Sequence, residues 1–338
     1  MVATIKDVAA RAKVSVSTVS RAFTRPEMVS ENTRTRVLAI ADELDFSISR
    51  SAAALKSGRT LRIALLISDH LRLWFSASII EGLNEVFHDR GYDLSIFQIS
   101  STEERRRFFD MLPVRRNADA VIVASFDVAP DEIARLSRTD VPIIGINCVD
   151  ARSTGFNAAV NIDDEQGSHL MARHLTNLGH RTIAYIRTDR EVSLHFSVQR
   201  RYESFVASCR SLGADPVTIV APEDEDRIGT VLTELLSMPH MPTAVACQED
   251  GIAIPLLFQL ERNGVDIPAD ISVVGYDDSF YAHDVGLTTV RQDPLLLAHK
   301  AAEKTMDLID RGTTDTPFET IPARLIVRSS TTKVSQTI

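Results

Sequence analysis

The 338-residue sequence is poor in three features that would each indicate a different class of protein. Its three cysteines are widely spaced and form no CxxC pair, which argues against a disulfide framework or a zinc site and predicts reduced, buried thiols. No apolar run approaches the roughly 18–20 residues that span a bilayer. The N-terminus lacks the basic start, apolar centre and cleavage site of a signal peptide, so we expect a cytoplasmic protein without a membrane partner.

Common catalytic motifs are also missing. The chain contains no GxSxG, HExxH, GxxxxGK[ST] or GxGxxG. Adjacent carboxylates such as Asp277 and Asp278 are expected to point apart on a strand or turn, which disfavours the paired carboxylates of a glycoside hydrolase. We therefore expect no enzyme, no catalytic residue, no metal and no cofactor, with a glycoside-processing enzyme as a remote alternative.

Charge is distributed unevenly along the chain. Residues 1–60 hold ten Lys or Arg and six Asp or Glu, a net charge of +4; since the whole chain carries −9, the other 278 residues carry −13. A small basic head on a large acidic body indicates that only the head meets a polyanion. An ordinary solvated charged face is the alternative, and charge by itself does not separate the two.

The head has the pattern of three short helices. Thr4 and Asp7 form a capping-box arrangement before the first helix, Ser15 is placed to cap the second, and Ser30 to cap the third after a loop at Pro26. Apolar residues recur at helical spacing in each helix and predict its buried face: Ile5, Val8, Ala9 and Ala12; Val19, Ala22 and Phe23; Val37, Ile40, Ala41 and Leu44.

The second helix, within "SVSTVSRAF", turns small hydroxyl groups and one arginine outward. Ser17, Thr18 and Arg21 lie opposite its apolar face. A recognition helix enters the major groove by its N-terminal turn, where small hydroxyls can reach phosphates or base edges and an arginine can reach guanine. This pattern favours a helix-turn-helix, although a small amphipathic helix pair with ordinary serines is the alternative.

The stretches "TIKDVAARAKVSVSTVSRAF" and "VSENTRTRVLAIADEL" resemble the headpiece of the lactose/galactose repressor (LacI/GalR) family of bacterial transcription regulators. The resemblance implies sequence-specific DNA binding. It implies that the base-reading positions are Val16, Ser17 and Arg21. It also makes the following residues candidates for phosphate contacts: Thr4, Ser15, Thr18 and Ser30.

The segment "SRSAAALKSG" occupies the place of the hinge helix in that family. By resemblance, two such hinges form helices in the minor groove when DNA is bound and wedge a leucine into the central base step. Leu55 matches that leucine, and Arg50 and Ala52 match neighbouring contact positions. Ile48 and Ser49 depart from the family's proline and asparagine, which leaves the helix start less rigid. A flexible linker is the alternative in the absence of DNA.

The body alternates short apolar runs with helical patterns, which is typical of a doubly wound α/β fold with a parallel sheet. Nine such runs are too many for one sheet, so we expect two lobes, with the change of lobe near 161–163. The runs are "RIALLI", "LSIFQI", "AVIVAS", "VPIIGIN", "AAVNI", "TIAYIR", "PVTIV", "TAVACQ" and "ISVVGY".

The family resemblance extends over the body through "NIDDEQGSHLMARHLTNLGHRTIAYI", "DIPADISVVGYDDSFYA" and "LTTVRQD". It implies two parallel-sheet lobes like those of periplasmic sugar-binding proteins. An extracytoplasmic solute-binding protein is a weak alternative because it has no use for a basic head. The expected divisions are a headpiece at 1–48, a hinge at 49–60 and an effector-binding and dimerisation body at 61–338, with lobe one at about 61–161 plus 292–328 and lobe two at about 162–291.

Polar and aromatic residues at the expected strand ends map onto the family's effector pocket. They are Asp69, Trp74, Phe75, Asn147, Asn161, Arg201, Glu249, Asp277 and Gln292. Three carboxylates against one arginine predict a neutral sugar, glycoside or polyol rather than a sugar phosphate or acid. A purine or another small metabolite is the alternative within the family. Glu249 stands where the family often has asparagine, which bears on specificity.

The expected assembly is a homodimer on a pseudo-palindromic DNA operator, because one small head makes too few contacts for strong specificity. Tetramers of the family use a leucine heptad tail. The last residues here, "RSSTTKVSQTI", are short and polar, so we expect no tetramer. We expect a repressor whose affinity for its operator is controlled by the bound effector.

Overall fold

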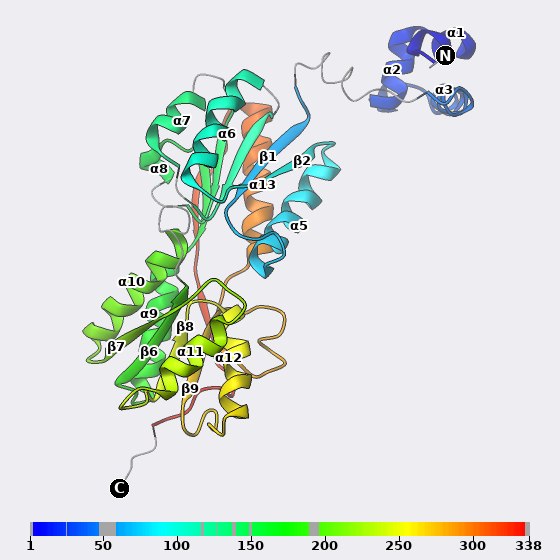
Figure 1. The fold of residues 1–338 in the computed structure, drawn as a ribbon. Helices are drawn as coiled ribbons and strands as arrows, with labels where there is room; N and C mark the ends of the chain where they lie inside the picture. Colours follow the sequence, from blue (N-terminus) through cyan, green and yellow to red (C-terminus); the bar gives the residue numbers. More distant parts are fainter. Residues whose placement is uncertain are drawn as a thin grey trace. The chain divides into compact units, whose positions relative to one another are not determined.

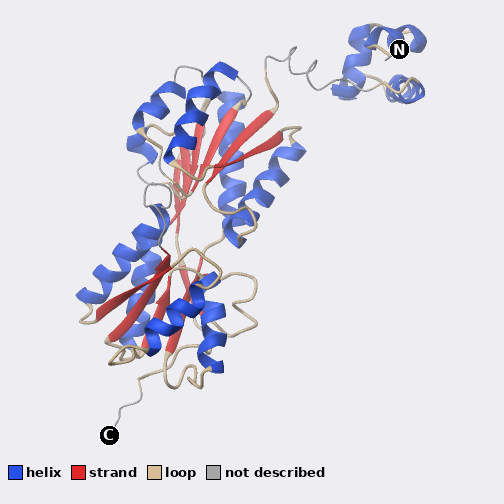
Figure 2. Ribbon diagram, in the orientation of Figure 1, coloured by secondary structure: helices blue, strands red, loops and turns tan. Residues whose placement is uncertain are grey.

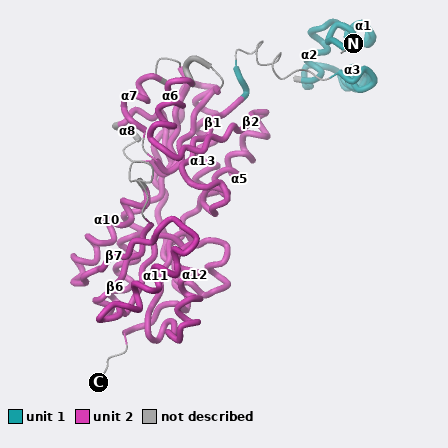
Figure 3. The backbone as a smooth tube through the Cα atoms, in the orientation of Figure 1, with its two compact units in different colours: residues 1–61 teal, residues 62–338 magenta. Residues whose placement is uncertain are grey.

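The computed structural model describes residues 3–24, 26–46, 59–115, 118–126, 128–136, 140–148, 151–188 and 196–334. The chain divides into two units, Met1–Leu61 and Arg62–Ile338 (Figure 3). None of the described helices combines the length and the apolar character that crossing a bilayer requires.

The first unit contains the three expected helices. They are α1 (Ile5–Ala12), α2 (Val16–Thr24) and α3 (Glu31–Glu43), with a 3₁₀ turn, η1 (Pro26–Met28), before the third. All the apolar residues expected on their inner faces lie in or against one small core. At the edge of this core, the rings of Phe23 and Phe46 meet edge to face with centroids 6.2 Å apart.

Two of the three expected helix caps form through side chains. The Asp7 carboxylate accepts hydrogen bonds from the backbone N and the hydroxyl of Thr4, at 2.8 and 2.7 Å. Ser15 Oγ accepts a bond from the backbone N of Thr18 at 3.1 Å. Ser30 occupies the N-cap position of α3, but its hydroxyl donates to Thr33 Oγ1 and makes no cap bond. Ser30 therefore stands at the expected N-cap position, but the expected hydrogen bond from the helix backbone to its side chain is not formed.

The second unit is built on two six-stranded sheets, and we call each sheet with its helices a lobe (Figures 1 and 2). In lobe one the strand order is β11-β5-β4-β3-β1-β2, and in lobe two it is β12-β10-β9-β8-β6-β7. Neighbouring strands run parallel except for the antiparallel pair β10 and β12. Lobe one contains β1 (Arg62–Ile67), β2 (Asp93–Gln98), β3 (Ala120–Ala124), β4 (Ile143–Ile146), β5 (Ala158–Ile162) and β11 (Phe318–Ile321). Lobe two contains β6 (Thr182–Thr188), β7 (Asp215–Ala221), β8 (Ala244–Cys247), β9 (Ser272–Asp277), β10 (Thr288–Arg291) and β12 (Arg324–Ile326).

Helices cover both faces of each sheet, which explains why the central strands carry uninterrupted apolar runs (Figure 2). Every residue of β3, β4, β8 and β9 is buried. The helices of lobe one are α5 (Trp74–Asp89), α6 (Thr102–Arg115), α7 (Pro130–Leu136), α8 (Ala151–Thr154) and α13 (Pro294–Arg311). Those of lobe two are α9 (Asp164–Asn177), α10 (Phe196–Ser211), α11 (Arg227–Leu236) and α12 (Asp250–Arg262).

All nine apolar runs of the body form strands, β1 to β9. The chain crosses from lobe one to lobe two between β5 and α9, returns between β10 and α13, and crosses again between β11 and β12. Strand β12 thus joins the sheet of lobe two, whereas the expected boundary assigned residues 292–328 to lobe one. The boundary is corrected at this strand, because its three residues carry no apolar run and pair only at the edge of the sheet.

Two histidines tie the end of the chain to lobe two. His180 Nε2 lies 3.0 Å from the carbonyl oxygen of Thr332, and its Nδ1 lies 2.9 Å from Thr243 Oγ1. His174 Nε2 lies 2.9 Å from Thr331 Oγ1. Burial lowers the pKa of both imidazoles below the ordinary value. Both rings are therefore held as neutral hydrogen-bonding groups.

The buried histidines predict a loss of stability in mild acid. The unfolded chain takes up protons on them near pH 6.5, whereas the folded protein does so only at lower pH, so the free energy of unfolding falls as pH drops from 7.5 to 5.5. Each histidine contributes up to about 1.4 kcal/mol per pH unit in this window. Urea unfolding followed by circular dichroism measures the slope. His180→Gln should flatten it, whereas the exposed His240→Gln should not; equal slopes in both variants would contradict the assignment.

Candidate functional site

A pocket lies within the second unit, with about 420 Å³ of empty space when the solvent at its open side is included. Six of its lining residues stand at or just after the carboxyl ends of strands from both sheets: Asp69, Ser125, Asn147, Glu249, Asp277 and Gln292. Four more come from α5 and α10: Phe75, Ser197, Val198 and Arg201. The carboxyl edge of a parallel sheet is the usual ligand site in such folds, so the topology itself explains why these residues meet.

Three of the strand-end residues have an unusual backbone conformation. The φ angles of Ser125, Asn147 and Asp277 are 62°, 52° and 125°, in a region that residues other than glycine rarely adopt. Each residue follows or ends a fully buried strand, where the chain must turn away at the pocket. Strained backbone of this kind gathers at functional sites, because the surrounding packing holds it in place.

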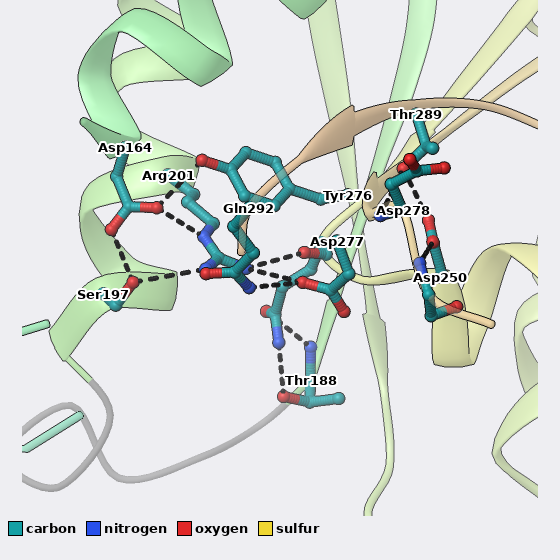
Figure 4. A network of polar contacts seen from close by, with 12 residues as sticks. Asp164, Thr188, Ser197, Arg201, Asp250, Tyr276, Asp277, Asp278, Thr289 and Gln292 are labelled. Carbon is teal, nitrogen blue, oxygen red and sulfur yellow. Dashed lines mark hydrogen bonds and ion pairs between the residues drawn. The ribbon is translucent and has the colours of Figure 1, made fainter. Parts of the chain in front are cut away.

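The guanidinium group of Arg201 is buried between two carboxylates (Figure 4). Its Nε donates to Asp164 Oδ1 at 2.7 Å, and its Nη1 lies 3.7 Å from Asp277 Oδ1. Longer bonds of 3.4 Å run from Nη1 to the carbonyl oxygen of Gln248 and from Nη2 to Ser197 Oγ. Burial would lower the pKa of Arg201, but the charge of Asp164 beside it raises that pKa above the ordinary value. Arg201 is therefore permanently charged.

Tyr276 supports the same guanidinium from a third direction. The centre of its ring lies 3.9 Å from Arg201 Cζ, and its hydroxyl donates to Asp164 Oδ1 at 2.9 Å. Gly167 makes room for this hydroxyl, because a Cβ there would lie 2.5 Å from it. The side chain of Arg201 thus has one orientation, set by helices α9 and α10 and by strand β9 (Figure 4).

Asp277 is the most buried of the three carboxylates that line the pocket. Burial raises its pKa well above the ordinary value, the charges of Asp250 and Glu249 raise it further, and Arg201 opposes them. Gln292 Nε2 donates to Asp277 Oδ1 at 2.6 Å. Glu249, which also lines the pocket, lies 3.7 Å from Arg227 Nη1.

Asp250 joins three elements that carry pocket residues. Its Oδ2 accepts from the backbone N of Ser279 at 2.8 Å, after β9, and its Oδ1 accepts from Thr289 Oγ1 at 2.7 Å, in β10 (Figure 4). Asp250 itself begins α12 and follows Glu249 in the chain. A Cβ on Gly275 would overlap Asp250 Oδ1, so glycine is required there. Burial raises the pKa of Asp250 to about 6.

Two buried polar atoms of the lining residues lack a hydrogen-bond partner within the described part of the chain. They are Asn147 Nδ2, a donor, and Gln292 Oε1, an acceptor. The other polar atom of each side-chain amide is already hydrogen-bonded. Asn147 Oδ1 accepts from the backbone N of Ile162 at 2.8 Å, and Gln292 Nε2 donates to Asp277 Oδ1. Buried polar atoms are usually paired, so these two are exceptions within the lining residues.

Seven of the nine expected pocket residues line this pocket, and Trp74 and Asn161 are not among its lining residues. The ring of Trp74 packs edge to face against Phe280, with centroids 6.3 Å apart. Asn161 is committed to the backbone of Cys148, accepting from its N at 3.0 Å and donating to its O at 2.9 Å. The structure thus gives both side chains other partners, and their expected contact with the effector stays a prediction.

The sequence analysis missed several residues of the pocket and its support. Ser125 directly follows the buried run of β3, so its place at a strand end was a readable signal. Ser197 and Val198 lie on α10 one turn before Arg201, a spacing that places them on the same face as that arginine. Asp164 gave no signal beyond its position after Asp163, the N-cap of α9.

In the first unit, most of the residues expected to contact DNA are exposed. Thr4, Ser15, Val16, Ser17, Arg21 and Ser30 are exposed and Thr18 is half-buried. Ser15 Oγ lies 2.7 Å from Ser17 Oγ and 2.8 Å from Thr18 Oγ1, so these hydroxyls form one cluster at the start of α2. The expected hinge contacts, Arg50, Ala52 and Leu55, lie outside the described residues. No group of three or more His, Cys, Asp or Glu in the described ranges is arranged to hold a metal ion.

Comparisons with known proteins place both units. The family of bacterial regulatory proteins, lacI family, matches residues 4–49, and the periplasmic binding protein-like domain matches residues 172–331. The HTH-type transcriptional regulator GalR of Escherichia coli (strain K12) is 30% identical over 311 residues, which cover 91% of this chain and 90% of GalR. The HTH-type transcriptional repressor PurR of Escherichia coli O139:H28 is 30% identical over 334 residues, which cover 97% of this chain and 96% of PurR.

Solved structures show the same architecture. The lac repressor dimer bound to operator and the anti-inducer ONPF superposes with a TM-score of 0.82 at 25% identity, covering 98% of this chain and 100% of that one. The complex of the transcriptional regulator CelR with cellobiose superposes with a TM-score of 0.67 at 25% identity, covering 97% and 99%. Together with the helix-turn-helix unit and the two-lobed body, these matches show that the chain belongs to the LacI family of bacterial regulatory proteins and is a DNA-binding transcriptional regulator, not an enzyme.

Proposed function

We propose that the protein is a repressor whose operator affinity is controlled by a neutral sugar, glycoside or polyol bound in the pocket between the two lobes. The observation that carries the proposal is the set of polar side chains at the strand ends, where carboxylate and amide groups surround the guanidinium of Arg201. A hydroxyl group both donates and accepts, so the hydroxyls of a sugar can bond to the carboxylates as well as to the arginine.

The charge of the pocket supports a neutral ligand. Its described lining contains three carboxylates, Asp69, Glu249 and Asp277, and a single guanidinium, Arg201. Carboxylates accept hydrogen bonds from hydroxyl groups, whereas a phosphate or carboxylate ligand would meet Asp69 and Glu249 in a partly desolvated site. Phe75 adds an aromatic ring to the lining, which suits the apolar face of a pyranose.

A purine is the second candidate, favoured by the similarity to relatives named PurR. Among solved structures, CelR holds cellobiose and a LacI-family regulator from Enterococcus faecium, 25% identical to this chain, holds ribose. The three lining carboxylates suit the hydroxyl groups of a sugar better than a purine ring, which has fewer donors to offer them. We therefore place a sugar first.

The first unit supplies the DNA contacts in this proposal. The hydroxyl cluster of Ser15, Ser17 and Thr18 stands at the start of α2, with Val16 and Arg21 exposed beside it. Such a small, polar N-terminal turn lets a recognition helix approach base edges in the major groove. The hinge at 49–60, with Arg50, Ala52 and Leu55, is proposed to enter the minor groove and to transmit the state of the pocket to the headpiece. Because such a regulator must reach DNA, we propose that it acts in the cytoplasm.

We propose that the protein acts as a homodimer on a pseudo-palindromic operator. Lobe two exposes three large aromatic side chains, Phe258, Phe280 and Tyr281, with exposed fractions of 48%, 71% and 68%. Phe280 already packs against Trp74, and aromatic residues are enriched at interfaces between subunits, so Phe258 and Tyr281 are candidates for such contacts. The lac repressor, which has the same fold, was crystallised as a dimer on its operator.

A thermal-shift screen of neutral sugars, polyols, sugar phosphates and purines tests the ligand. A ligand at 100 times its dissociation constant stabilises the protein by about 2.7 kcal/mol, which raises the melting temperature by several degrees. Gln292→Ala removes a polar side chain of the pocket together with its hydrogen bond to Asp277, and it should weaken binding of the neutral hit by about 10- to 100-fold in calorimetry. Gln166→Ala, an exposed glutamine outside this pocket, is the matched control. Stabilisation by a purine alone would replace the sugar with the second candidate.

Arg21→Ala tests the reading surface of α2. On an operator selected from random duplexes, the variant should bind about 1–3 kcal/mol more weakly and accept substitutions at one base pair that the wild type rejects. Arg11→Ala removes an exposed arginine that pairs with Glu43 at 3.1 Å and should keep the wild-type sequence preference. Fluorescence anisotropy with single-base operator variants measures both. Unchanged preference in Arg21→Ala would remove Arg21 from the base-reading set.

A further inference from the structure

The carboxylate of Asp164 is committed on both oxygens. Its Oδ1 accepts from Arg201 Nε and Tyr276 Oη, at 2.7 and 2.9 Å, and its Oδ2 accepts from Ser197 Oγ (Figure 4). Its side chain is 7% exposed. Asp164 is absent from the residues that line the pocket, whereas two of its partners, Arg201 and Ser197, belong to them. Asp164 is therefore connected to the described lining of the pocket through these partners.

This arrangement changes what Arg201 offers to the pocket. The guanidinium has five N–H donors, of which Nε–H is taken by Asp164. The terminal nitrogens make bonds of 3.4 Å, which are long, and each carries a second hydrogen. Donors thus remain for a ligand oxygen. The positive charge, however, already has the carboxylate of Asp164 as a partner at 2.7 Å, and an incoming anion cannot displace this carboxylate because other hydrogen bonds hold it in place.

We propose that Asp164 is a specificity-determining positioning residue: it neutralises Arg201, so that the pocket uses this arginine as a hydrogen-bond donor for hydroxyl groups and rejects ligand anions. The inference rests on the proposed sugar function and extends it to a residue outside the pocket. Arginines that face a pocket without such a partner bind carboxylates and phosphates strongly, and removing Asp164 should move the site toward that behaviour.

The chain offers a matched control in the preceding residue. Asp163 is the N-cap of α9, and its Oδ1 accepts from the backbone N of Gln166 at 2.9 Å. Asp163→Asn removes one negative charge next to Asp164 and keeps a good capping residue, since asparagine caps as well as aspartate. Asp164→Glu keeps the charge at the site and shifts it by one methylene group.

Calorimetry on neutral and anionic partners of the same sugar tests the proposal. The probes are D-galactose with D-galacturonate and D-glucose with D-glucuronate, on the full-length wild type and the three variants. In Asp164→Asn the ratio of acid affinity to neutral-sugar affinity should rise by about tenfold or more, because one countercharge is lost in a partly buried site. The ratio cancels a general loss of packing, which weakens both probes alike. Asp163→Asn and Asp164→Glu should keep the wild-type ratio.

The outcomes separate the two proposals. A neutral sugar that binds the wild type, with an unchanged ratio in Asp164→Asn, overturns the role of Asp164 and leaves the sugar function standing. An equal rise in Asp163→Asn or Asp164→Glu also overturns it, since the effect would then be general or geometric. Binding of neither neutral probe to any of the four proteins counts against these two sugars as effectors, and the role of Asp164 is then decided without a ligand.

The ligand-free measurement uses the arginine Nε–H signals in nitrogen-15 NMR spectra. In the wild type, the Nε–H of Arg201 should exchange slowly with water, because it is buried and bonded to Asp164. Asp164→Asn should remove this protected signal while Asp163→Asn keeps it, and urea unfolding of each variant confirms that it is folded. The inference is overturned if Asp164→Asn keeps every protected signal of the wild type. If Asp164→Asn does not fold, Arg201→Lys takes its place, and the inference is overturned if that variant leaves the protected signals unchanged.

Discussion

The shared direction of the strands is the constraint on which the site depends. Within each sheet all neighbours run parallel except β10 and β12, so the carboxyl ends of the central strands meet at one edge. Residues that are more than 200 positions apart in the chain, such as Asp69 and Gln292, are brought to one pocket in this way. Helices cover both faces of each sheet and bury the central strands, and the polar residues of the pocket stand at or just after strand ends.

Burying a charge at such an edge requires compensation, and lobe two supplies it in two places. Arg201 is held by Asp164, Asp277 and the ring of Tyr276, because an isolated buried guanidinium would be strongly unfavourable. Asp250 is held by a backbone amide and a threonine hydroxyl. Both clusters connect helices to strands β9 and β10, so the groups that set the electrostatics of the pocket also fix the positions of its lining residues.

The sequence predicted the elements well because their signals are local. The apolar spacing of the first 44 residues anticipated the core of the headpiece, including Val19 and Val37, and nine apolar runs anticipated strands β1 to β9. Strands β10, β11 and β12 were missed as runs because they are three or four residues long and contain threonine, glutamate or arginine. Short polar edge strands take their structure from the neighbour with which they pair, and a single sequence does not display that neighbour.

What the sequence determined by itself was the identity of the headpiece helices, the order of the long strands and the group of polar residues at their ends. The tertiary structure decided which of those residues share the pocket. Asn161 and Trp74 follow the same sequence rules as Asn147 and Phe75, yet Cys148 and Phe280 engage them. Only the tertiary structure revealed Asp164 beside Arg201, because the two lie 37 positions apart on different helices. Side-chain partnerships across elements depend on packing distances that local sequence patterns do not encode.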